Sequence, residues 1–421
     1  MEGEFAFILV DIVKDNIKVY YGRDRFGIRP LFSYIDKNSF YFSSELKGLP
    51  FDGLGNQVQP RKIFYIDFIN STINDYEYYK INNTLSINNL NNDDYYFFIL
   101  NKIKLTLTES VRNMMQTERP LGALLSGGLD SSLIAGIAAK ILREKGERLN
   151  TFSIGIEEDA PDIQYARKVS KHINSIHHEI IIPVEKWINN LKNVIKQIET
   201  YDITTIRAST GQYLIGKWIK ENTDIKVLLN GDGSDELTSG YLYFYNASSP
   251  EEAHKENINL LSQIHNYDVL RVDRGISAWG LEARVPFLSH KFVDMYLGID
   301  PSLRNPIKGK RIEKSLLRNA FIEENIIPKE VLLRQKEAFS DAVSNKKKSW
   351  YEYIEEHVKC NLDLNDINIS KKFPSIESWY YYLIFKQYYP KSKLEVKYWM
   401  PKWTNEHNGD PSARKLKSLI D

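Results

Sequence analysis

Short apolar stretches separated by turn residues occupy the first 46 residues, and this pattern is typical of β-strands. Gly22, Gly27 and Pro30 punctuate the stretches. We expect strands at Phe5 to Asp11, Ile17 to Tyr21, Leu31 to Ile35 and Phe40 to Phe42. Their edges have no obvious partners, whereas a stable sheet needs closure or cover. The pattern therefore predicts an all-β region that is incomplete as a domain.

The segment from Asn70 to Asp94 is rich in asparagine and aspartate, and this composition favours turns and open coil over packing. We place a linker at residues 81–95. It separates an amino-terminal domain at residues 1–80 from a larger domain at residues 96–421.

Beyond the linker, helical and strand-like patterns alternate. Apolar residues recur at helical spacing from Ile99 to Met114, and the short apolar run Leu121 to Leu125 follows. Further strands are expected at Thr151 to Ile156, His178 to Ile182 and Val227 to Leu229, with helices near 184–199 and 207–221 between them. This alternation predicts an α/β fold with a parallel sheet covered by helices on both faces. The part from about 245 to 405 is expected to be mainly helical, with the aromatic stretch Trp379 to Phe385 in a core helix.

Composition narrows the function classes. Hydrophobic residues make up 42% of the chain and charged residues 26%, while 56 Lys and Arg against 55 Asp and Glu give a net charge of +1. A balanced charge disfavours bulk binding to nucleic acid or to an anionic membrane. We find neither a spanning segment nor a signal peptide. One cysteine, Cys360, excludes an internal disulfide framework and indicates the cytoplasm.

The most informative segment is Ser126-Gly-Gly-Leu-Asp-Ser-Ser132, which lies between a predicted strand and a predicted helix. Small residues let backbone N–H groups close around a polyphosphate, and the helix start adds its positive dipole end. Asp130 is placed to hold Mg²⁺ against that phosphate. The alternative is a plain strand-to-helix turn in which Ser126 or Asp130 caps the helix.

A second glycine-rich turn, Asn230-Gly-Asp-Gly-Ser-Asp-Glu236, follows the strand at Val227 to Leu229. Ligands of open α/β sheets bind outside the carboxyl ends of the strands, so the two turns should converge there. Asp235 is then a second candidate Mg²⁺ ligand. Taken alone, this acidic turn is more typical of a solvated loop.

These two turns and three further segments resemble the asparagine synthetase B family, the glutamine-hydrolysing type, and the Ser126 loop resembles the pyrophosphate loop of ATP-pyrophosphatases. The matching segments occur in order along the chain: Glu199 to Thr210, Gly231 to Glu236, Ser277 to Leu288 and Arg334 to Asp341. The resemblance runs from Met1 through Asp410-Pro411-Ser412. It implies an adenine nucleotide α-hydrolase-like synthetase domain, preceded by a remnant of an N-terminal-nucleophile-type glutaminase domain.

The implied reaction is that of a carbon–nitrogen ligase of asparagine biosynthesis. Aspartate attacks the α-phosphate of ATP to give β-aspartyl-AMP and pyrophosphate, and ammonia then displaces AMP. By this resemblance Asp130 and Asp235 bind Mg²⁺. ATP is held by Leu125, Ser126, Gly127, Gly128, Asp130, Ser131, Ser132, Ile154, Asn230 and Gly231.

The resemblance also assigns the acceptor and catalytic residues. Thr204, Thr205 and Arg207 match the aspartate-binding segment, and a guanidinium suits a carboxylate because it offers two parallel hydrogen bonds. Without the match, the threonines could equally cap a helix. Lys336 would stabilise the charge of the leaving pyrophosphate. Asp232 and Arg284 match the region that handles ammonia, although Arg284 and Glu282 could equally form an ion pair. Lys310, Glu313 and Lys314 fit the family pattern or an exposed charge ladder.

Departures from the family pattern accompany these matches. Asn230 and Asp232 stand where the family has Ser and Glu, which shortens the carboxylate by one methylene, and Ser289 replaces an aspartate. No catalytic cysteine follows Met1, and what remains, including Gly22 to Pro30 and Phe42 to Lys47, matches the last third of the glutaminase domain. We therefore expect ammonia as the nitrogen donor, or glutamine if an upstream glutaminase part exists. A homodimer is a compatible assembly.

Two other groups of residues are weaker candidates for a functional site. His177-His178-Glu179 lacks zinc-ligand spacing and falls in a predicted strand, so a metal role is disfavoured. Arg271-Val-Asp-Arg274 is more typical of a structural ion pair than of a phosphate clamp. Two rival functions remain: another adenylating member of the superfamily, such as a β-lactam synthetase-like enzyme, and an inactive nucleotide-binding remnant.

Overall fold

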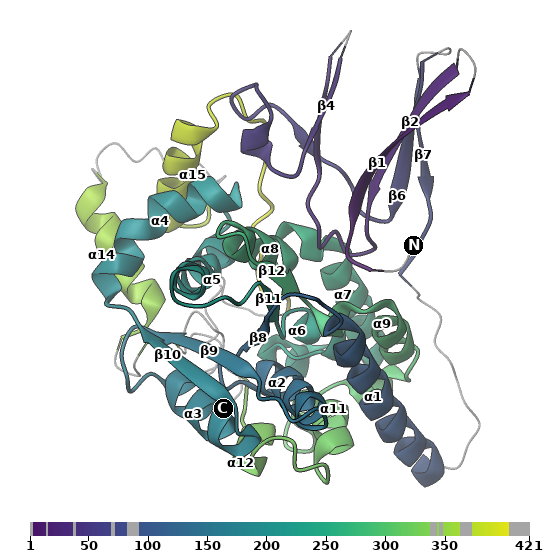
Figure 1. Ribbon diagram of the computed structural model, residues 1–421, viewed down its shortest axis with the longest axis vertical. Helices are drawn as coiled ribbons and strands as arrows, with labels where there is room; N and C mark the ends of the chain where they lie inside the picture. Colours follow the sequence, from purple (N-terminus) through teal and green to yellow (C-terminus); the bar gives the residue numbers. More distant parts are fainter. Residues whose placement is uncertain are drawn as a thin grey trace.

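The computed structural model describes residues 3–13, 16–36, 39–68, 72–81, 92–336, 343–344, 348–362 and 373–403. Within these ranges the chain forms a smaller β-rich region at the amino-terminal end and a larger region of helices around a second sheet (Figure 1). Figure 1 shows the strands of the first region projecting from one side of the helical body.

The β-rich region contains two small antiparallel sheets. One has the order β1-β2-β6-β7 and the other β4-β3-β5. Their bounds are β1 (Ala6–Val13), β2 (Asn16–Arg23), β3 (Phe32–Ile35), β4 (Phe40–Ser43), β5 (Asn56–Gln57), β6 (Lys62–Asp67) and β7 (Thr72–Glu77). A small core of Tyr21, Leu31, Val58 and Ile66 is buried here. The four strands expected before residue 46 are confirmed.

The coil expected from Asn70 onward is wrong at Thr72–Glu77, which forms β7 at the edge of the first sheet. All six residues of β7 are exposed, and its two apolar residues, Ile73 and Tyr76, are too few to give a strand pattern. Residues 82–91 lie outside the described part of the chain. The linker at 81–95 and the domain boundaries on either side of it therefore stay predictions.

The larger region is built on a five-stranded sheet in the order β10-β9-β8-β11-β12. Every neighbouring pair is parallel, as the alternation of elements predicted. The strands are β8 (Leu121–Leu124), β9 (Asn150–Gly155), β10 (Ile176–Ile181), β11 (Val227–Leu229) and β12 (Glu282–Arg284). Sequence patterns did not reveal the short strand β12.

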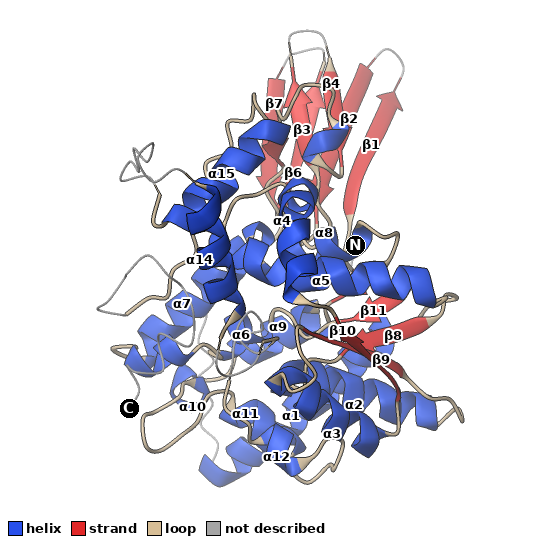
Figure 2. Cartoon of the chain, turned by 90° about the vertical axis from the view of Figure 1, so that its left-hand side faces the viewer, coloured by secondary structure: helices blue, strands red, loops and turns tan. Residues whose placement is uncertain are grey.

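Helices cover both faces of this sheet. Figure 2 shows α2 (Leu129–Arg143) and α3 (Pro161–Ile173) on one side, with α4 (Val184–Ile198) and α5 (Ile203–Asn222) on the other. The other helices are α1 (Asn92–Met114), α6 (Ser234–Thr238), α7 (Pro250–Gln263), α8 (Asp268–Ser277), α9 (His290–Leu297), α10 (Pro301–Arg304), α11 (Ser315–Phe321), α12 (Lys329–Leu332), α14 (Trp350–Asn361) and α15 (Ile376–Tyr388). Tyr381, Ile384 and Phe385 of α15 are buried, which confirms the predicted core helix. None of the helices in the described part of the chain combines the length and apolar character needed to cross a bilayer.

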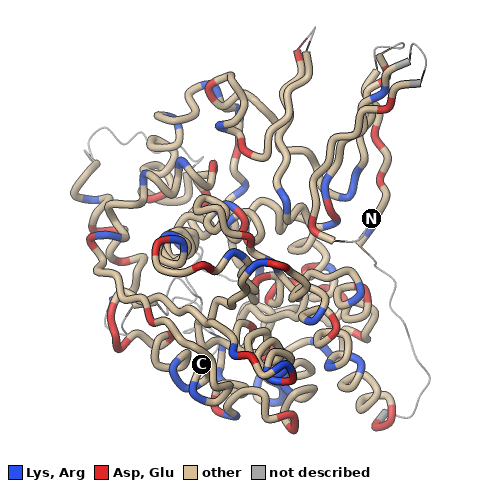
Figure 3. The backbone as a smooth tube through the Cα atoms, viewed as in Figure 1, with Lys and Arg blue, Asp and Glu red and all other residues tan. Residues whose placement is uncertain are grey.

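Buried charged groups join the two regions. Arg29 of the β-rich region pairs with Asp273 of α8 at 2.8 Å and with Glu4 at 2.6 Å, and it also donates to the carbonyl of Ala283. The carboxylate of Glu199, which follows α4, accepts the backbone N–H groups of Leu46 and Lys47 at 2.7 and 2.8 Å. Acidic and basic residues are interspersed over the whole trace (Figure 3), consistent with the net charge of +1.

Candidate active site

A cavity of about 240 Å³ lies at the carboxyl edge of the parallel sheet. Its walls come from the turns after β8 and β11, from strand β9, from α5 and α8, and from the segments before α11 and after α12. Most of the site residues expected from the sequence line this cavity: Leu125, Ser126, Gly128, Asp130, Ser131, Ile154, Thr204, Arg207, Asn230, Gly231, Asp232, Asp235 and Lys336. Chain segments far apart in sequence therefore meet at one place.

The two glycine-rich turns touch each other at Gly231. A Cβ on Gly231 would lie 2.7 Å from the backbone nitrogen of Ser131 and 2.9 Å from the carbonyl carbon of Asp130, so only glycine permits this approach. Ser234 Oγ, at the start of α6, donates to Asp130 Oδ1 at 2.8 Å. The convergence of the two turns, predicted from their position after parallel strands, is confirmed.

The start of α2 is not capped by a side chain. Its N-cap residue is Gly128, which has no side chain to accept the free N–H groups of the first turn. Ser126 and Ser131 instead contact each other through their hydroxyl groups at 3.0 Å. Because neither Ser126 nor Asp130 caps the helix, the alternative of a plain capped turn is not what the structure shows. The N–H groups of an uncapped helix start are suited to an anion.

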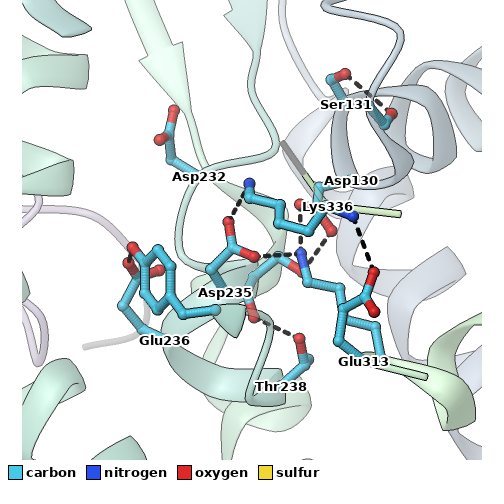
Figure 4. Close-up of polar contacts among 12 residues, drawn as sticks. Asp130, Ser131, Asp232, Asp235, Glu236, Thr238, Glu313 and Lys336 are labelled. Atoms are coloured by element: carbon cyan, nitrogen blue, oxygen red, sulfur yellow. Dashed lines mark hydrogen bonds and ion pairs between the residues drawn. The ribbon is translucent and has the colours of Figure 1, made fainter. Parts of the chain in front are cut away.

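Two aspartates and two lysines form the centre of the site (Figure 4). Lys314 Nζ lies 2.6 Å from Asp130 Oδ2 and 2.6 Å from Asp235 Oδ1. Lys336 Nζ lies 2.5 Å from Asp235 Oδ2. The backbone N–H of Lys336 donates to Glu313 Oε1 at 2.9 Å, and Arg318 contacts the same oxygen at 2.6 Å. Lys314 is therefore a buried member of the site and not part of an exposed charge ladder.

The charges in this cluster stabilise each other. Burial alone would raise the pKa of Asp235, but the ammonium groups of Lys314 and Lys336 hold it well below its ordinary value. Burial alone would lower the pKa of Lys336, but the carboxylates of Asp235 and Asp130 raise it above its ordinary value. Asp235 and Lys336 are therefore both charged over the whole physiological pH range.

One end of the cavity is apolar. Leu125, Phe152 and Ile154 line it and are between 0% and 3% exposed. The backbone N–H of Leu125 donates to the carbonyl of Phe152 at 2.8 Å, so this donor is already engaged. The ladder between β8 and β9 ends at the pair Leu124 and Phe152, two residues before Ile154. This end is suited to a flat apolar ring whose edge meets backbone groups.

The segment expected to bind aspartate also contributes Thr204 and Arg207 to the cavity lining. Asp202, the N-cap of α5, accepts the hydroxyl groups of Thr204 and Thr205 at 2.6 and 2.7 Å. Arg207 makes a two-point contact with Glu377 of α15, through Nε at 2.9 Å and Nη2 at 2.5 Å. Both partners are buried. The guanidinium expected to bind a substrate carboxylate is thus also held by a carboxylate of the protein.

A second buried charge network surrounds Asp232. Arg271 of α8 pairs with Asp232 at 2.7 Å and with Asp268 at 2.5 Å. Gln212 Nε2 donates to Asp232 Oδ2 at 3.3 Å. Close by, Tyr241 donates its hydroxyl to Glu236. Burial raises the pKa of Glu236 well above its ordinary value, and the nearby carboxylates of Asp268 and Asp235 raise it further. In Figure 4, Asp232 points away from the lysine cluster.

Sequence reasoning underestimated Arg271, which lines the cavity and orients Asp232. The three charged residues of Arg271 to Arg274 do not form one local ion pair. Asp273 pairs with Arg29, and Arg274 pairs with Glu45 at 2.6 Å. Glu236, Tyr241 and Asp268 also line the cavity without having been expected there. Their partners lie on other elements, so only the glycine-rich motif pointed to Glu236, and nothing local pointed to Asp268.

Four expected residues do not line this cavity: Gly127, Ser132, Thr205 and Arg284. Arg284, on β12, pairs with Glu282 at 2.7 Å and donates to the carbonyls of Met114 and Gln116, which corresponds to the ion-pair interpretation. Ser289 stands at the start of α9, also outside the cavity lining. Residues 337–341 of the last matching segment lie outside the described part of the chain.

The described residues contain no group of three or more His, Cys, Asp or Glu side chains that could hold a metal ion. His177 instead contacts the hydroxyls of Thr151 and Ser153, and burial lowers its pKa to about 4. Asp130 and Asp235 supply two carboxylates that face one cation, Lys314. Mg²⁺ is commonly bound by one or two carboxylates together with substrate phosphates, so this pair fits Mg²⁺ bound with a nucleotide.

A parallel sheet with glycine-rich turns, lysines and paired aspartates at its carboxyl edge defines an α/β protein of the nucleotide-binding class. A sequence model described as asparagine synthase matches residues 102–260 and 246–402, and one described as a glutamine amidotransferase domain matches residues 1–50. The chain is 41% identical to the glutamine-hydrolyzing asparagine synthetases of Homo sapiens and Rattus norvegicus over 447 residues, which cover 99% of this chain and 78% of each relative. The Gallus gallus protein is similar to the same degree. The chain belongs to the asparagine synthase family.

Proposed function

We propose that this chain is a ligase that makes asparagine from aspartate, ATP and ammonia, releasing AMP and pyrophosphate. The observation that carries the proposal is the single cavity in which the Ser126 loop, the Thr204 and Arg207 segment and the cluster of Asp130, Asp235 and Lys336 meet. The 41% identity to asparagine synthetases over 99% of the chain supports the same reaction.

In the first step, a β-carboxylate oxygen of aspartate bonds to the α-phosphorus of ATP, and the bond from that phosphorus to the bridging oxygen breaks. The apolar end at Leu125, Phe152 and Ile154 would receive the adenine ring. The Ser126 loop and the uncapped start of α2 would hold the phosphates. Mg²⁺ bound by Asp130 and Asp235 would neutralise charge on the departing pyrophosphate. The ammonium of Lys336, fixed by Asp235, adds a second positive charge beside the same group.

Aspartate would lie beside Thr204 and Arg207, which both line the cavity. Since Glu377 makes a two-point contact with Arg207, we propose that this pair fixes the position of the guanidinium beside the α-carboxylate of the substrate. In the second step, the ammonia nitrogen bonds to the β-carbonyl carbon, AMP leaves, and the nitrogen loses a proton. Asp232 is the proposed acceptor of this proton, because it is a cavity carboxylate held in place by Arg271 and Gln212.

The proposed nitrogen donor depends on whether the chain has a cysteine that could serve as the nucleophile of a glutaminase. Its single cysteine, Cys360, is exposed on α14 and does not line the cavity. We therefore propose that this polypeptide uses free ammonia, and that glutamine serves as donor where a glutaminase part is joined to it. The cytoplasmic location, the homodimer and the catalytic role of Arg284 stay predictions from the sequence.

The test is formation of asparagine and pyrophosphate from aspartate and Mg-ATP, with ammonium or glutamine supplied in separate reactions. Product with ammonium alone supports the proposal. Pyrophosphate release that depends on a different carboxylic acid would favour the β-lactam synthetase-like alternative, and ATP binding without release under any acceptor would favour an inactive remnant. None of the relatives compared favours either alternative.

A further inference from the structure

Lys314 occupies an unusual position between the two aspartates. Its side chain is 1% exposed, and its Nζ contacts both Asp130 and Asp235 at 2.6 Å. The ammonium is therefore a close ion-pair partner of both carboxylates, in a position between one oxygen of each.

The backbone conformation of Lys314 and the lack of a side chain at Gly240 allow the lysine to reach the two aspartates. Lys314 has φ 58° and ψ 25°, a left-handed conformation that costs a non-glycine residue free energy and persists only where the surroundings enforce it. Gly240 leaves the space that the side chain fills. A Cβ at Gly240 would lie 2.1 Å from Asp235 Oδ1 and 2.2 Å from Lys314 Cε. Any other residue at position 240 would displace the lysine or the aspartate.

An ammonium at this point and a divalent cation shared by the same two oxygens exclude each other. Mg²⁺ sits about 2.0–2.1 Å from its oxygen ligands, so an ion joining Asp130 and Asp235 would fall within the volume of the Lys314 ammonium. The two cations would also repel each other strongly in a buried site. Lys336 differs, because its Nζ contacts Asp235 on the other oxygen and its side chain is 24% exposed.

We propose that Lys314 is a built-in counter-ion that takes the place of the metal in the empty site and must leave the aspartate pair when the metal–nucleotide complex enters. The inference rests on the proposed use of Asp130 and Asp235 as metal ligands. Lys314 keeps the two carboxylates together and suppresses metal binding in the absence of nucleotide. Because the protein supplies only two carboxylates, the nucleotide phosphates are needed as further ligands of the metal. They are also needed to attract the Lys314 ammonium away from the two aspartates.

The test is titration of the full chain with Mn²⁺ alone, with free Mn²⁺ followed by electron paramagnetic resonance at constant ionic strength. The variants are Lys314→Met and the matched Lys336→Met, which removes a neighbouring charge without vacating the shared position. We expect Lys314→Met to bind Mn²⁺ at least tenfold more tightly than the natural protein, and Lys336→Met to change affinity by less than threefold. Equal tightening in both variants, or no tightening in Lys314→Met, would overturn the proposal.

A second variant covers a folding failure. If Lys314→Met does not fold without metal, Lys314→Gln removes the charge and keeps one hydrogen-bond donor, and the same tightening is expected and the same results count against the proposal. Circular dichroism checks that each variant is folded. Because the titration contains no substrate, a failure of asparagine synthesis would not affect it, and an unchanged Mn²⁺ affinity beside normal synthesis would reject only the role of Lys314.

Discussion

The two regions of the chain handle apolar residues in opposite ways. On β1, Ile8, Leu9, Val10 and Ile12 are between 48% and 66% exposed. On β11, all three residues from Val227 to Leu229 are buried. A strand covered on both faces gains free energy from burial of each side chain, whereas β1 gains little. The comparison teaches that the parallel sheet carries the chemistry in a fully buried setting. The β-rich region leaves β1 exposed and joins the larger region through charged contacts and through apolar residues such as Phe26 and Leu46, which belong to the main core.

The largest expected effect is a loss of turnover caused by a substitution in the cavity. Lys336→Ala removes the ammonium beside the leaving pyrophosphate, and turnover is expected to fall on the order of 10²- to 10³-fold while ATP binding is retained. Lys62→Ala in the β-rich region removes an exposed ion pair with Asp75 and should leave turnover unchanged. Pyrophosphate release measures both. Normal turnover in Lys336→Ala would remove this lysine from the mechanism.

Truncation of an apolar residue should lower the free energy of unfolding more in the parallel sheet than in the β-rich region. Leu228→Ala empties a fully buried position on β11 and should lower the free energy of unfolding by about 2–5 kcal/mol. Val10→Ala on β1 should lower it by less than about 0.5 kcal/mol. Urea denaturation followed by circular dichroism measures both changes. Similar losses in the two variants would contradict the contrast drawn between the sheets.

The contact between the regions should depend on pH through Glu4. Burial raises the pKa of Glu4 from 4.5 to about 7, although Arg29 lowers it in part. Between these two values the folded protein binds more protons than the unfolded chain. The free energy of unfolding therefore falls as the pH rises from about 4.5 to 7, by up to about 1.4 kcal/mol per pH unit.

Glu4→Gln should remove this part of the pH dependence, because the amide does not titrate. Urea denaturation at several pH values gives the slope for the natural protein and the variant. Glu77→Gln, which changes an exposed carboxylate on β7, is the control and should keep the slope. Identical slopes in the natural protein and Glu4→Gln would show that Glu4 does not control this interface.

The smallest effect concerns the exposed surface of β1. Val10→Lys places a charge on this strand, and charged residues on edge strands counteract self-association. We expect weaker fluorescence of a bound apolar dye and unchanged turnover, with the melting temperature moving by only a degree or two. Loss of turnover in this variant would show that the β-rich region influences the cavity directly.

The elements with a strong apolar signal could be predicted from the sequence, and β7 could not. The helical stripe of Ile99, Ile103, Leu107 and Val111 is buried on α1, as its spacing indicated. Thr72–Glu77 forms β7 although every residue is exposed, since pairing with β6 and not burial holds it. Strand prediction relied on runs of apolar residues, such as the exposed run on β1, and Thr72–Glu77 contains only Ile73 and Tyr76, which form no such run.

Some contacts of the candidate site could likewise be predicted from the sequence, and others could not. Asp130 and Asp235 could be brought together from sequence because each follows a parallel strand, and that topology fixes their meeting. The pair of Arg207 and Glu377 joins residues 170 positions apart, and no local pattern indicates such a partner. Lys314 was ambiguous because its helical spacing says nothing of a left-handed residue just before α11. Contacts between distant elements therefore had to come from the fold itself.

The ten-residue helix α8 contacts both the cavity and the β-rich region. Arg271 holds the cavity carboxylate of Asp232, while two and three residues further on Asp273 holds Arg29 and Arg274 holds Glu45. A helix of this length spans about 15 Å and does not bend easily. The contacts with the cavity and with the β-rich region therefore belong to one short segment of α8, in which Arg271 lies within one helical turn of Asp273 and Arg274.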